Sequence, residues 1–266
     1  MNDVVGTYLY AVALARDAPP LEGLTGVAGG PVWAISHAGL AAYVSAVSLT
    51  EFGEEPLRES LEDLDWLGET ARAHHRVVEA VAEKTPTAPV RLVTVYRDEA
   101  QVRELLEQRH DDFVEVLSRI AGHDEWGVKV FVAPSAAAPA EETAAPSSPG
   151  TAYLKRRQAS LQTREEAWHQ AVARAERIHD TLSAVAVASC RHRAQDPQLT
   201  GREEWMVLNG AYLVDAARAQ ELGRLVQELR GEGVDVELTG PWAPYSFTTP
   251  VEPLESSESE ARDDVL

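Results

Sequence analysis

The stretch from Thr151 to about Ala188 constrains the fold most, because it contains no proline or glycine. Those two residues are the ones that interrupt helices, so the stretch predicts a single helix, roughly 57 Å long at about 1.5 Å per residue. A seven-residue repeat runs through Leu154, Leu161, Trp168, Ala175 and Leu182, joined later by Ala171, Ile178 and Val185. Such spacing is typical of a coiled-coil-like seam, packed on its own domain, on the first domain or on another chain.

A low-complexity run precedes this helix. Residues 133–150 (APSAAAPAEETAAPSSPG) contain mainly Ala, Pro, Ser and Glu, which bury too little apolar surface to offset the entropy of ordering them. We therefore expect a flexible linker at 133–150 between an N-terminal domain at 1–132 and a C-terminal domain at 151–250. Residues 251–266, which are rich in acids, predict a disordered tail.

The first domain alternates between strand and helix patterns. A strand of β-formers, a hairpin and two amphipathic helices separated by a further strand are expected before a final alternating strand. The ranges are 7–14 for the first strand, 32–37 and 41–47 for the hairpin, 65–84 for the first helix, 90–96 for the next strand, 98–120 for the second helix and 126–132 for the last strand. In the first strand, the alternation places Tyr8, Tyr10, Val12 and Leu14 on one face. This order predicts an α+β fold of the ferredoxin-like kind, with helices covering one face of a mostly antiparallel sheet.

The second domain repeats most of this pattern after its long helix. The segments are a strand at 189–195, a strand at 205–215, a helix at 216–230 and an alternating strand at 234–238. Asn209-Gly210 is the sequence of a type I′ hairpin turn, but we favour one continuous strand with a glycine bulge. The fold class is therefore α+β with two domains, ferredoxin-like elements and a long helix that opens the second domain.

An aromatic stretch, Gly240–Phe247 (GPWAPYSF), follows the last strand and contains three aromatic residues and two prolines. Proline lacks a backbone donor, so the stretch is neither a central strand nor a helix. Its aromatic residues either pack against the protein or contact a partner. Its position predicts that it closes the second domain.

Charge and composition exclude several classes of function. The net charge of −19 argues against nucleic acid and against anionic membranes, which require a basic surface. The single cysteine, Cys190, fits a reducing compartment, and the N-terminus resembles neither a signal peptide nor a membrane span. These features predict a soluble cytoplasmic protein.

No motif for catalysis, a cofactor or a metal is found in the chain, including P-loop, GxGxxG, HExxH, GxSxG and CxxC patterns. The pairs His74-His75 and Cys190/His192 are more typical of packed or surface residues than of metal ligands. The basic cluster Lys155-Arg156-Arg157 is more typical of a solvated helix end than of an anion site. We therefore expect no enzyme activity and no cofactor. The enzyme alternative places a small-molecule site between the two domains, around His74, Arg91 and Lys129.

Six segments in this order resemble the gas vesicle protein F/L family (GvpF/GvpL). They are AHHRVVEAV, PVRLVTVY, EWGVKVFV, TAYLKRRQ, MVLNGAYLVD and GPWAPYSF. The resemblance extends from about Thr7 to Phe247 and departs from the family's pattern at three places. Ala243 stands where a proline is usual, Val93 where a glycine is common, and Gly150 lies two residues further from the tyrosine-leucine pair than usual.

The resemblance implies an accessory, minor structural protein of gas vesicles that is not an enzyme. Family members are thought to bind the hydrophobic main shell protein, limit its aggregation in a chaperone-like way and assist vesicle nucleation and assembly. The implied partners are the shell protein and other gas vesicle accessory proteins, in the cytoplasm and at the vesicle, with homo- or hetero-oligomers left open. A generic scaffold that acts through the helix at 151–188 is the alternative. The candidate structural or interface residues are Trp242, Pro244, Tyr245, Phe247, Trp126, Arg91, Tyr153, Arg156 and Arg157.

Overall fold

The computed structural model describes residues 4–132, 149–195, 202, 204–231 and 233–248; within 149–156 and 159–164 it describes the backbone alone. The chain forms two compact units. The first consists of the residues up to Gly122 together with those from Trp242 onward, and the second is His123–Pro241.

This division differs from the boundary expected at 133–150. The strand β5 (His123–Val132) pairs along its whole length with β7 (Trp205–Asp215), from His123 opposite Asp215 to Val132 opposite Trp205. A strand belongs to the sheet whose hydrogen bonds it completes, so β5 is part of the second unit and not of the first. Of the linker expected at 133–150, residues 133–148 lie outside the described residues, and Pro149 and Gly150 are the first residues of helix α6 (Pro149–Ser183). The tail expected at 251–266 also lies outside the described residues.

The first unit contains a four-stranded sheet in the order β2-β3-β1-β4. The strands are β1 (Val5–Leu14), β2 (Val32–His37), β3 (Leu40–Ser48) and β4 (Ala88–Tyr96), and each neighbouring pair is antiparallel. The expected turn between β2 and β3 is present, with Ala38 and Gly39 at φ values of 49° and 81°.

The alternation expected along β1 does not continue through the strand. The pairing register with β3 shifts between Leu9 and Ala11, which leaves Tyr10 as an extra residue. A bulge of this kind reverses which face the following side chains occupy. Tyr8 and Tyr10 therefore share one apolar cluster with Ala11 and Ala13 rather than with Val12 and Leu14.

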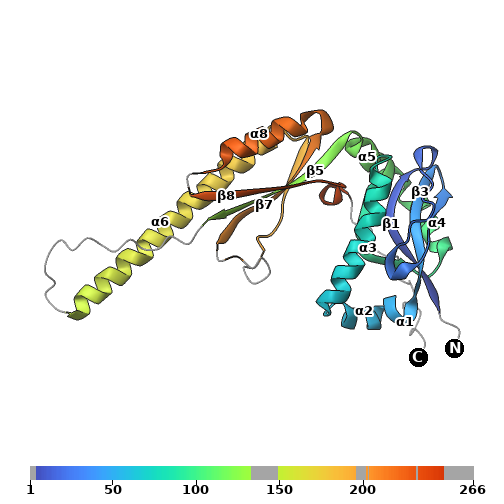
Figure 1. Cartoon of the computed structure of the whole chain (residues 1–266), viewed down its shortest axis with the longest axis horizontal. Helices are drawn as coiled ribbons and strands as arrows, with labels where there is room; N and C mark the ends of the chain where they lie inside the picture. Colours follow the sequence, from blue (N-terminus) through green and yellow to red (C-terminus); the bar gives the residue numbers. More distant parts are fainter. Residues whose placement is uncertain (1–3, 133–148, 196–201, 203, 232, 249–266) are drawn as a thin grey trace, which may run out of the picture. The chain divides into compact units, whose positions relative to one another are not determined.

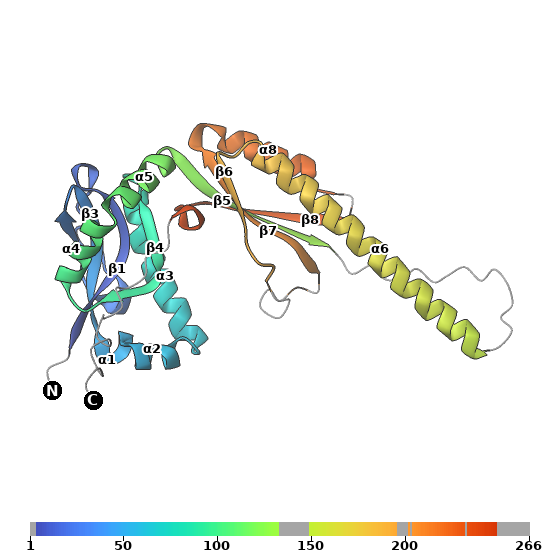
Figure 2. The same ribbon diagram turned by 180° about the vertical axis from the view of Figure 1, so that it is seen from behind.

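Helices cover both faces of this sheet, and the expectation of one covered face was wrong. The helices are α1 (Leu49–Phe52), α2 (Glu54–Ser60), α3 (Leu64–Ala82), α4 (Glu99–Gln108) and α5 (His110–Ile120). The apolar stripe of α3 packs on the tyrosine side of β1, whereas α4 and α5 pack on the opposite side (Figures 1 and 2). The single helix expected over 98–120 is two helices, because Arg109 leaves helical geometry at φ −108° and ψ 20°. Its predicted buried face is nevertheless confirmed, from Val102 through Ile120.

The second unit has the element order β-α-β-β-α-β. Its elements are β5, α6 (Pro149–Ser183), β6 (Ala188–Arg191), β7, α8 (Ala219–Leu229) and β8 (Val234–Trp242). The sheet order β6-β7-β5-β8 is the same as in the first unit when the strands are counted from the start of each. Both helices lie on one face of the sheet (Figure 1), and their apolar side chains form one cluster with those of the strands.

Several boundaries in the second unit differ from expectation. Helix α6 ends at Ser183, about a turn before the expected end near Ala188, and β6 ends at Arg191 rather than at residue 195. The continuous strand favoured over 205–215 is confirmed as β7, but its bulge is not at Gly210. The register with β5 shifts opposite Val130 and Phe131, between Leu208 and Met206, so Val207 is the extra residue.

Candidate functional site

Helix α3 places two adjacent histidines at the edge of the first unit's core. Asp63 caps the helix, since its side chain accepts hydrogen bonds from the backbone N–H groups of Asp65 and Trp66. His74 lies on the buried stripe and is 3% exposed, as the periodicity predicted. His75 is half-buried and pairs with Glu79 one turn later, at 3.3 Å.

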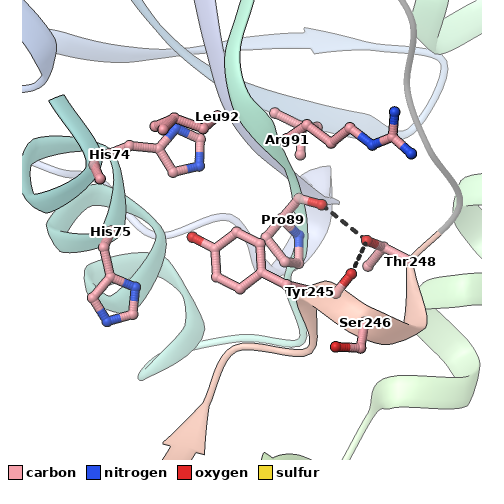
Figure 3. Close-up of a pocket in the computed structure, with 10 residues that line it drawn as sticks. His74, His75, Pro89, Arg91, Leu92, Tyr245, Ser246 and Thr248 are labelled. Carbon is pink, nitrogen blue, oxygen red and sulfur yellow. Dashed lines mark hydrogen bonds between the residues drawn. The ribbon is translucent and has the colours of Figure 1, made fainter. Parts of the chain in front are cut away.

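Strand β4 bulges widely opposite β1, and Arg91 and Leu92 lie in this bulge. Figure 3 shows Leu92 beside His74, whereas the Arg91 guanidinium is directed away from both histidines. Leu9 pairs with Thr94 and Ala11 pairs with Pro89, so four residues of β4 stand opposite Tyr10 alone. The bulge ends at Val93, whose φ of 63° lies in the left-handed region that β-branched residues rarely adopt.

The aromatic stretch closes the first unit, not the second as expected. Ala243 belongs to the apolar cluster beneath α3, and Phe247 is 9% exposed. Two hydrogen bonds fix the end of the stretch, from the Arg119 guanidinium to the Phe247 carbonyl at 2.8 Å and from the Thr248 hydroxyl to the Pro89 carbonyl at 3.1 Å. These contacts place the 3₁₀ turn η4 (Tyr245–Phe247) beside β4.

A cavity of about 560 Å³ lies among α3, β4 and η4. The residues that line it are Ala71, His74, His75, Pro89, Val90, Arg91, Leu92, Tyr245, Ser246 and Thr248. Figure 3 shows the Tyr245 ring between the two histidines of α3 and Pro89, with Arg91 farther along β4. All the lining residues belong to the first unit. The volume falls within the range of small-molecule pockets, about 300–1,000 Å³.

Hydrogen bonding fixes the protonation of His74. The Tyr8 hydroxyl accepts the Val93 N–H at 2.9 Å, so its own proton is directed to Nδ1 of His74 at 3.1 Å. Nδ1 is then an acceptor, and the neutral ring carries its proton on Nε2. Burial lowers the pKa of His74 from 6.5 to about 4. A hydrogen bond to the Val90 backbone raises this pKa and the charge of His75 lowers it, both by less than burial does. Nε2 is buried and has no partner in full hydrogen-bonding geometry.

The cavity presents hydrogen-bond donors and no carboxylate among its ten lining residues. No cluster of three histidine, cysteine or acidic residues suited to a metal occurs in the part of the chain that the structure describes. The cavity's side chains are therefore suited to binding an acceptor or an anion.

The other candidate residues are spread over both units. Pro244 is buried in the first unit, whereas Trp242 is 41% exposed and its ring lies 5.4 Å from that of His75. Trp126 is half-buried against the apolar cluster of the second unit. Arg157 is exposed on α6. Tyr153 and Arg156 also lie on α6, at positions whose side chains are outside the described residues.

The enzyme alternative combined His74, Arg91 and Lys129. The structure brings His74 and Arg91 to one cavity. Lys129 belongs to the second unit, where its ammonium donates to the Gln195 amide oxygen at 3.1 Å. Cys190 and His192 share the second unit too, with Sγ and Nε2 at 3.9 Å.

Sequence reasoning missed the tyrosines and the hydroxyl residues of this site. Tyr8 was assigned to a strand face, but nothing in its neighbours indicates that its hydroxyl reaches β4 and α3. Tyr245 was considered only as a packing or partner residue. The one signal available in the sequence was Val93, which stands where the resembled family commonly has a glycine. In the structure Val93 adopts a backbone conformation suited to glycine.

Comparison with known proteins decides the family. A family model described as gas vesicle synthesis protein GvpL/GvpF matches residues 6–249. The chain belongs to this family. It is 46% identical over 243 residues to gas vesicle protein L of a Streptomyces species, a match that covers 90% of this chain and 91% of the other. It is 26% identical over 264 residues to gas vesicle protein L1 of Halobacterium salinarum, which covers 91% and 90%.

A solved structure supports the fold. The crystal structure of gas vesicle protein GvpF from an Anabaena species matches with a TM-score of 0.64, covering 94% of this chain and 98% of that one at 18% identity. The resemblance inferred from the six sequence segments is thus confirmed, as is the α+β fold class. The chain is a gas vesicle protein of the GvpL/GvpF family.

Proposed function

We propose that this protein is an accessory component of gas vesicles that binds the hydrophobic main shell protein, limits its aggregation and assists vesicle nucleation and assembly. The observation that carries the proposal is the family match over residues 6–249, together with 46% identity to gas vesicle protein L. The net charge of −19 supports it, because a strongly charged protein opposes self-association of an apolar partner that it binds.

The finer structural description belongs to the same proposal. The second unit is a ferredoxin-like domain, supported by its β-α-β-β-α-β order and by the sheet order β6-β7-β5-β8. The first unit is a second α+β domain with an additional helical layer. None of the helices in the described residues is long and apolar enough to cross a membrane. The protein acts in the cytoplasm and at the vesicle, without catalysis and without a cofactor.

Trp242 is the residue through which we propose contact with the shell protein. It is 41% exposed, whereas its neighbours Ala243 and Phe247 are buried. The stretch therefore divides between residues that hold the first unit together and one large aromatic ring that remains accessible. Exposed aromatic rings held on a fixed backbone are typical anchors of protein interfaces.

The test is co-expression with the main shell protein, followed by co-purification and by light scattering of the soluble fraction. The wild-type protein is expected to retain the shell protein in solution, and Trp242→Ala to retain at least tenfold less while its melting temperature falls by only a few degrees. Trp168→Ala is the matched control, since Trp168 is 40% exposed and lies in the second unit. Equal scattering with and without the wild-type protein would overturn the proposed function. Equal retention by the two variants would remove Trp242 as the contact.

From Ala171 onward, α6 does not favour the alternative scaffold role, although Trp168, one heptad earlier in the predicted seam than Ala175, is 40% exposed. Its predicted seam is covered within the second unit, where Ala171, Ala175, Ile178, Leu182 and Val185 are buried. Ala175, Ile178 and Leu182 pack against residues of β5, β7 and α8. This half of the seam is therefore not available to a second chain. Leu154 and Leu161 have side chains outside the described residues.

A further inference from the structure

The cavity beside α3 contains a buried donor with no well-aligned acceptor. Nε2 of His74 carries the proton of a neutral ring, because Nδ1 accepts from Tyr8. Only the backbone of Val90 is near Nε2, outside full hydrogen-bonding geometry, although His74 is only 3% exposed. A buried donor without a partner costs about 1–3 kcal/mol. Native proteins retain such groups rarely, and a ligand that supplies the missing acceptor recovers the cost.

The mouth of the same cavity carries a positive charge. Arg91 is exposed, and no residue whose side chain the structure describes forms an ion pair with it. The remaining polar side chains of the lining are imidazole and hydroxyl groups, and the acid nearest to them in sequence, Glu79, pairs with His75. The Arg91 guanidinium is therefore available to an anion at the mouth of the cavity.

The walls between these two groups are apolar. Ala71, Pro89, Val90 and Leu92 line the cavity with the ring of Tyr245. Figure 3 shows Leu92 above His74 and the Tyr245 ring directed toward the histidines. A ligand that fits this lining has an aliphatic or aromatic body, one neutral oxygen acceptor and one carboxylate.

We propose that this cavity is a binding site for an N-acylated apolar amino acid, either free or as the C-terminal residue of a peptide. The α-carboxylate binds the Arg91 guanidinium, which matches a carboxylate with paired N–H donors. The amide carbonyl accepts the Nε2–H of His74, and the apolar side chain lies against Leu92 and Tyr245. The site does not depend on the proposed contact with the shell protein.

The charge of His74 agrees with the neutral acceptor assigned to it. Burial holds the pKa of His74 near 4, so the ring is uncharged at neutral pH and donates a hydrogen bond without supplying a charge. The titratable groups that face it are Tyr8 and Tyr10 on β1, His75 on its own helix, and Tyr245 on η4. None of these is a carboxylate, so the amide carbonyl of the ligand suits this position better than its carboxylate does.

The test uses the full chain and N-acetyl-L-leucine or N-acetyl-L-phenylalanine as probes, titrated by calorimetry and by NMR of the histidine side chains. The acids are expected to bind saturably, and the corresponding amides, N-acetyl-L-leucinamide and N-acetyl-L-phenylalaninamide, at least tenfold more weakly, because they lack the charge. The Nε2–H signal of His74 should become slower to exchange with water when the acid is bound. The proposal is wrong if neither acid binds at millimolar concentration, or if acids and amides bind equally.

Variants separate the site from general charge effects. Arg91→Gln is expected to weaken binding of the acid by about tenfold or more, the loss of a charge-assisted hydrogen bond. Arg76→Gln removes the same charge from an exposed position of α3 that does not line the cavity, and should leave binding within about twofold. Equal loss in both variants would overturn the site. Since Arg91 is exposed, its replacement is not expected to unfold the protein.

Two peptides distinguish the sources of the ligand. A hexapeptide that ends in leucine with a free carboxylate is compared with the same peptide amidated at its C-terminus. Tighter binding of the free peptide than of N-acetyl-L-leucine assigns the site to protein C-termini. Tighter binding of N-acetyl-L-leucine assigns it to small N-acyl amino acids. Binding of the amidated peptide as tight as that of the free one would contradict the proposal, because the carboxylate would then have no role.

Discussion

The hydroxyl oxygen of Tyr8 accepts the backbone N–H of Val93 at 2.9 Å, across the bulge of β4. This bond satisfies the Val93 N–H, one of the donors that the bulge removes from the pairing with β1, and Tyr8 is fully buried. The same hydroxyl reaches His74, so one side chain joins β1, β4 and α3. The strained backbone at Val93 and the buried histidine therefore depend on a single phenol.

Val93 should be replaced by glycine with less loss of stability than by alanine. Both changes remove a side chain that packs on the core cluster, but only glycine also relieves a φ of 63°. Since left-handed geometry costs an ordinary residue about 1–2 kcal/mol, and glycine's extra flexibility offsets about half of that, Val93→Gly should be about 1 kcal/mol more stable than Val93→Ala. Hydrogen exchange of the β1 amides measures the difference. If Val93→Ala proves more stable than Val93→Gly, as is usual for residues in strands, the backbone at Val93 is not strained.

Removing the Tyr8 hydroxyl should destabilise the first unit. Tyr8→Phe leaves the ring in place but leaves the Val93 N–H without an acceptor, at a cost of about 1–3 kcal/mol. Tyr43→Phe is the control, because the Tyr43 hydroxyl only donates, to the carbonyl of Pro19, in a part-buried position. We expect the first change to cost more in urea unfolding. Equal costs would mean that the bulge finds another acceptor.

Acid should weaken the first unit through His74. Its pKa falls from 6.5 to about 4 on folding. Between these two pH values the His74 ring is protonated in the unfolded chain and neutral in the folded chain. Stability is therefore fully present above pH 6.5 and falls with decreasing pH until about pH 4, with a loss of about 2 kcal/mol at pH 5. An NMR titration of His74 measures the pKa directly. A midpoint near 6.5 in the folded protein would contradict this account, and in His74→Gln the fall in stability between pH 7 and pH 5 should be smaller.

The sequence predicted elements whose signal is local and missed relations that arise only in the fold. The periodicity of α3 correctly predicted that His74 lies on the buried stripe, and β5 and β7 were both predicted as strands. These predictions succeeded because each pattern depends only on residues close together in the sequence. The bulge at Tyr10 and the break at Arg109 have no such signal, since a single residue shifts the pattern only slightly. Trp242 directly follows residues of β8 that belong to the second unit. Because the prediction relied on this adjacency in sequence, it assigned the aromatic stretch to the wrong unit. The cavity joins residues that are 177 positions apart in the sequence, Ala71 and Thr248, so only the folded structure could reveal it.

Glycines of the second unit should respond oppositely to alanine. Gly240 has a φ of 125°, and an added Cβ would lie 2.9 Å from the Glu125 carbonyl oxygen. Gly240→Ala is therefore expected to destabilise the second unit by at least about 1–3 kcal/mol. Gly223 lies on α8 with no atom near an added Cβ, so Gly223→Ala should stabilise by about 0.5–1 kcal/mol. Hydrogen exchange of the β7 amides reports on both, and a shift of the same sign in the two variants would contradict this geometry.

Within the aromatic stretch, stability should depend on Phe247 more than on Trp242. Phe247 is 9% exposed and Trp242 is 41% exposed. Emptying a buried phenylalanine site costs about 3–5 kcal/mol, whereas a ring that leaves much of its surface in water loses about 1 kcal/mol on truncation. Phe247→Ala should therefore speed hydrogen exchange in β1 and β4, and Trp242→Ala should change it little. Arg119→Gln, which removes the bond to the Phe247 carbonyl, should give a smaller effect in the same amides as Phe247→Ala. If Trp242→Ala proves the more damaging change, then Trp242 is a structural residue, and its role as the shell-protein contact fails with it.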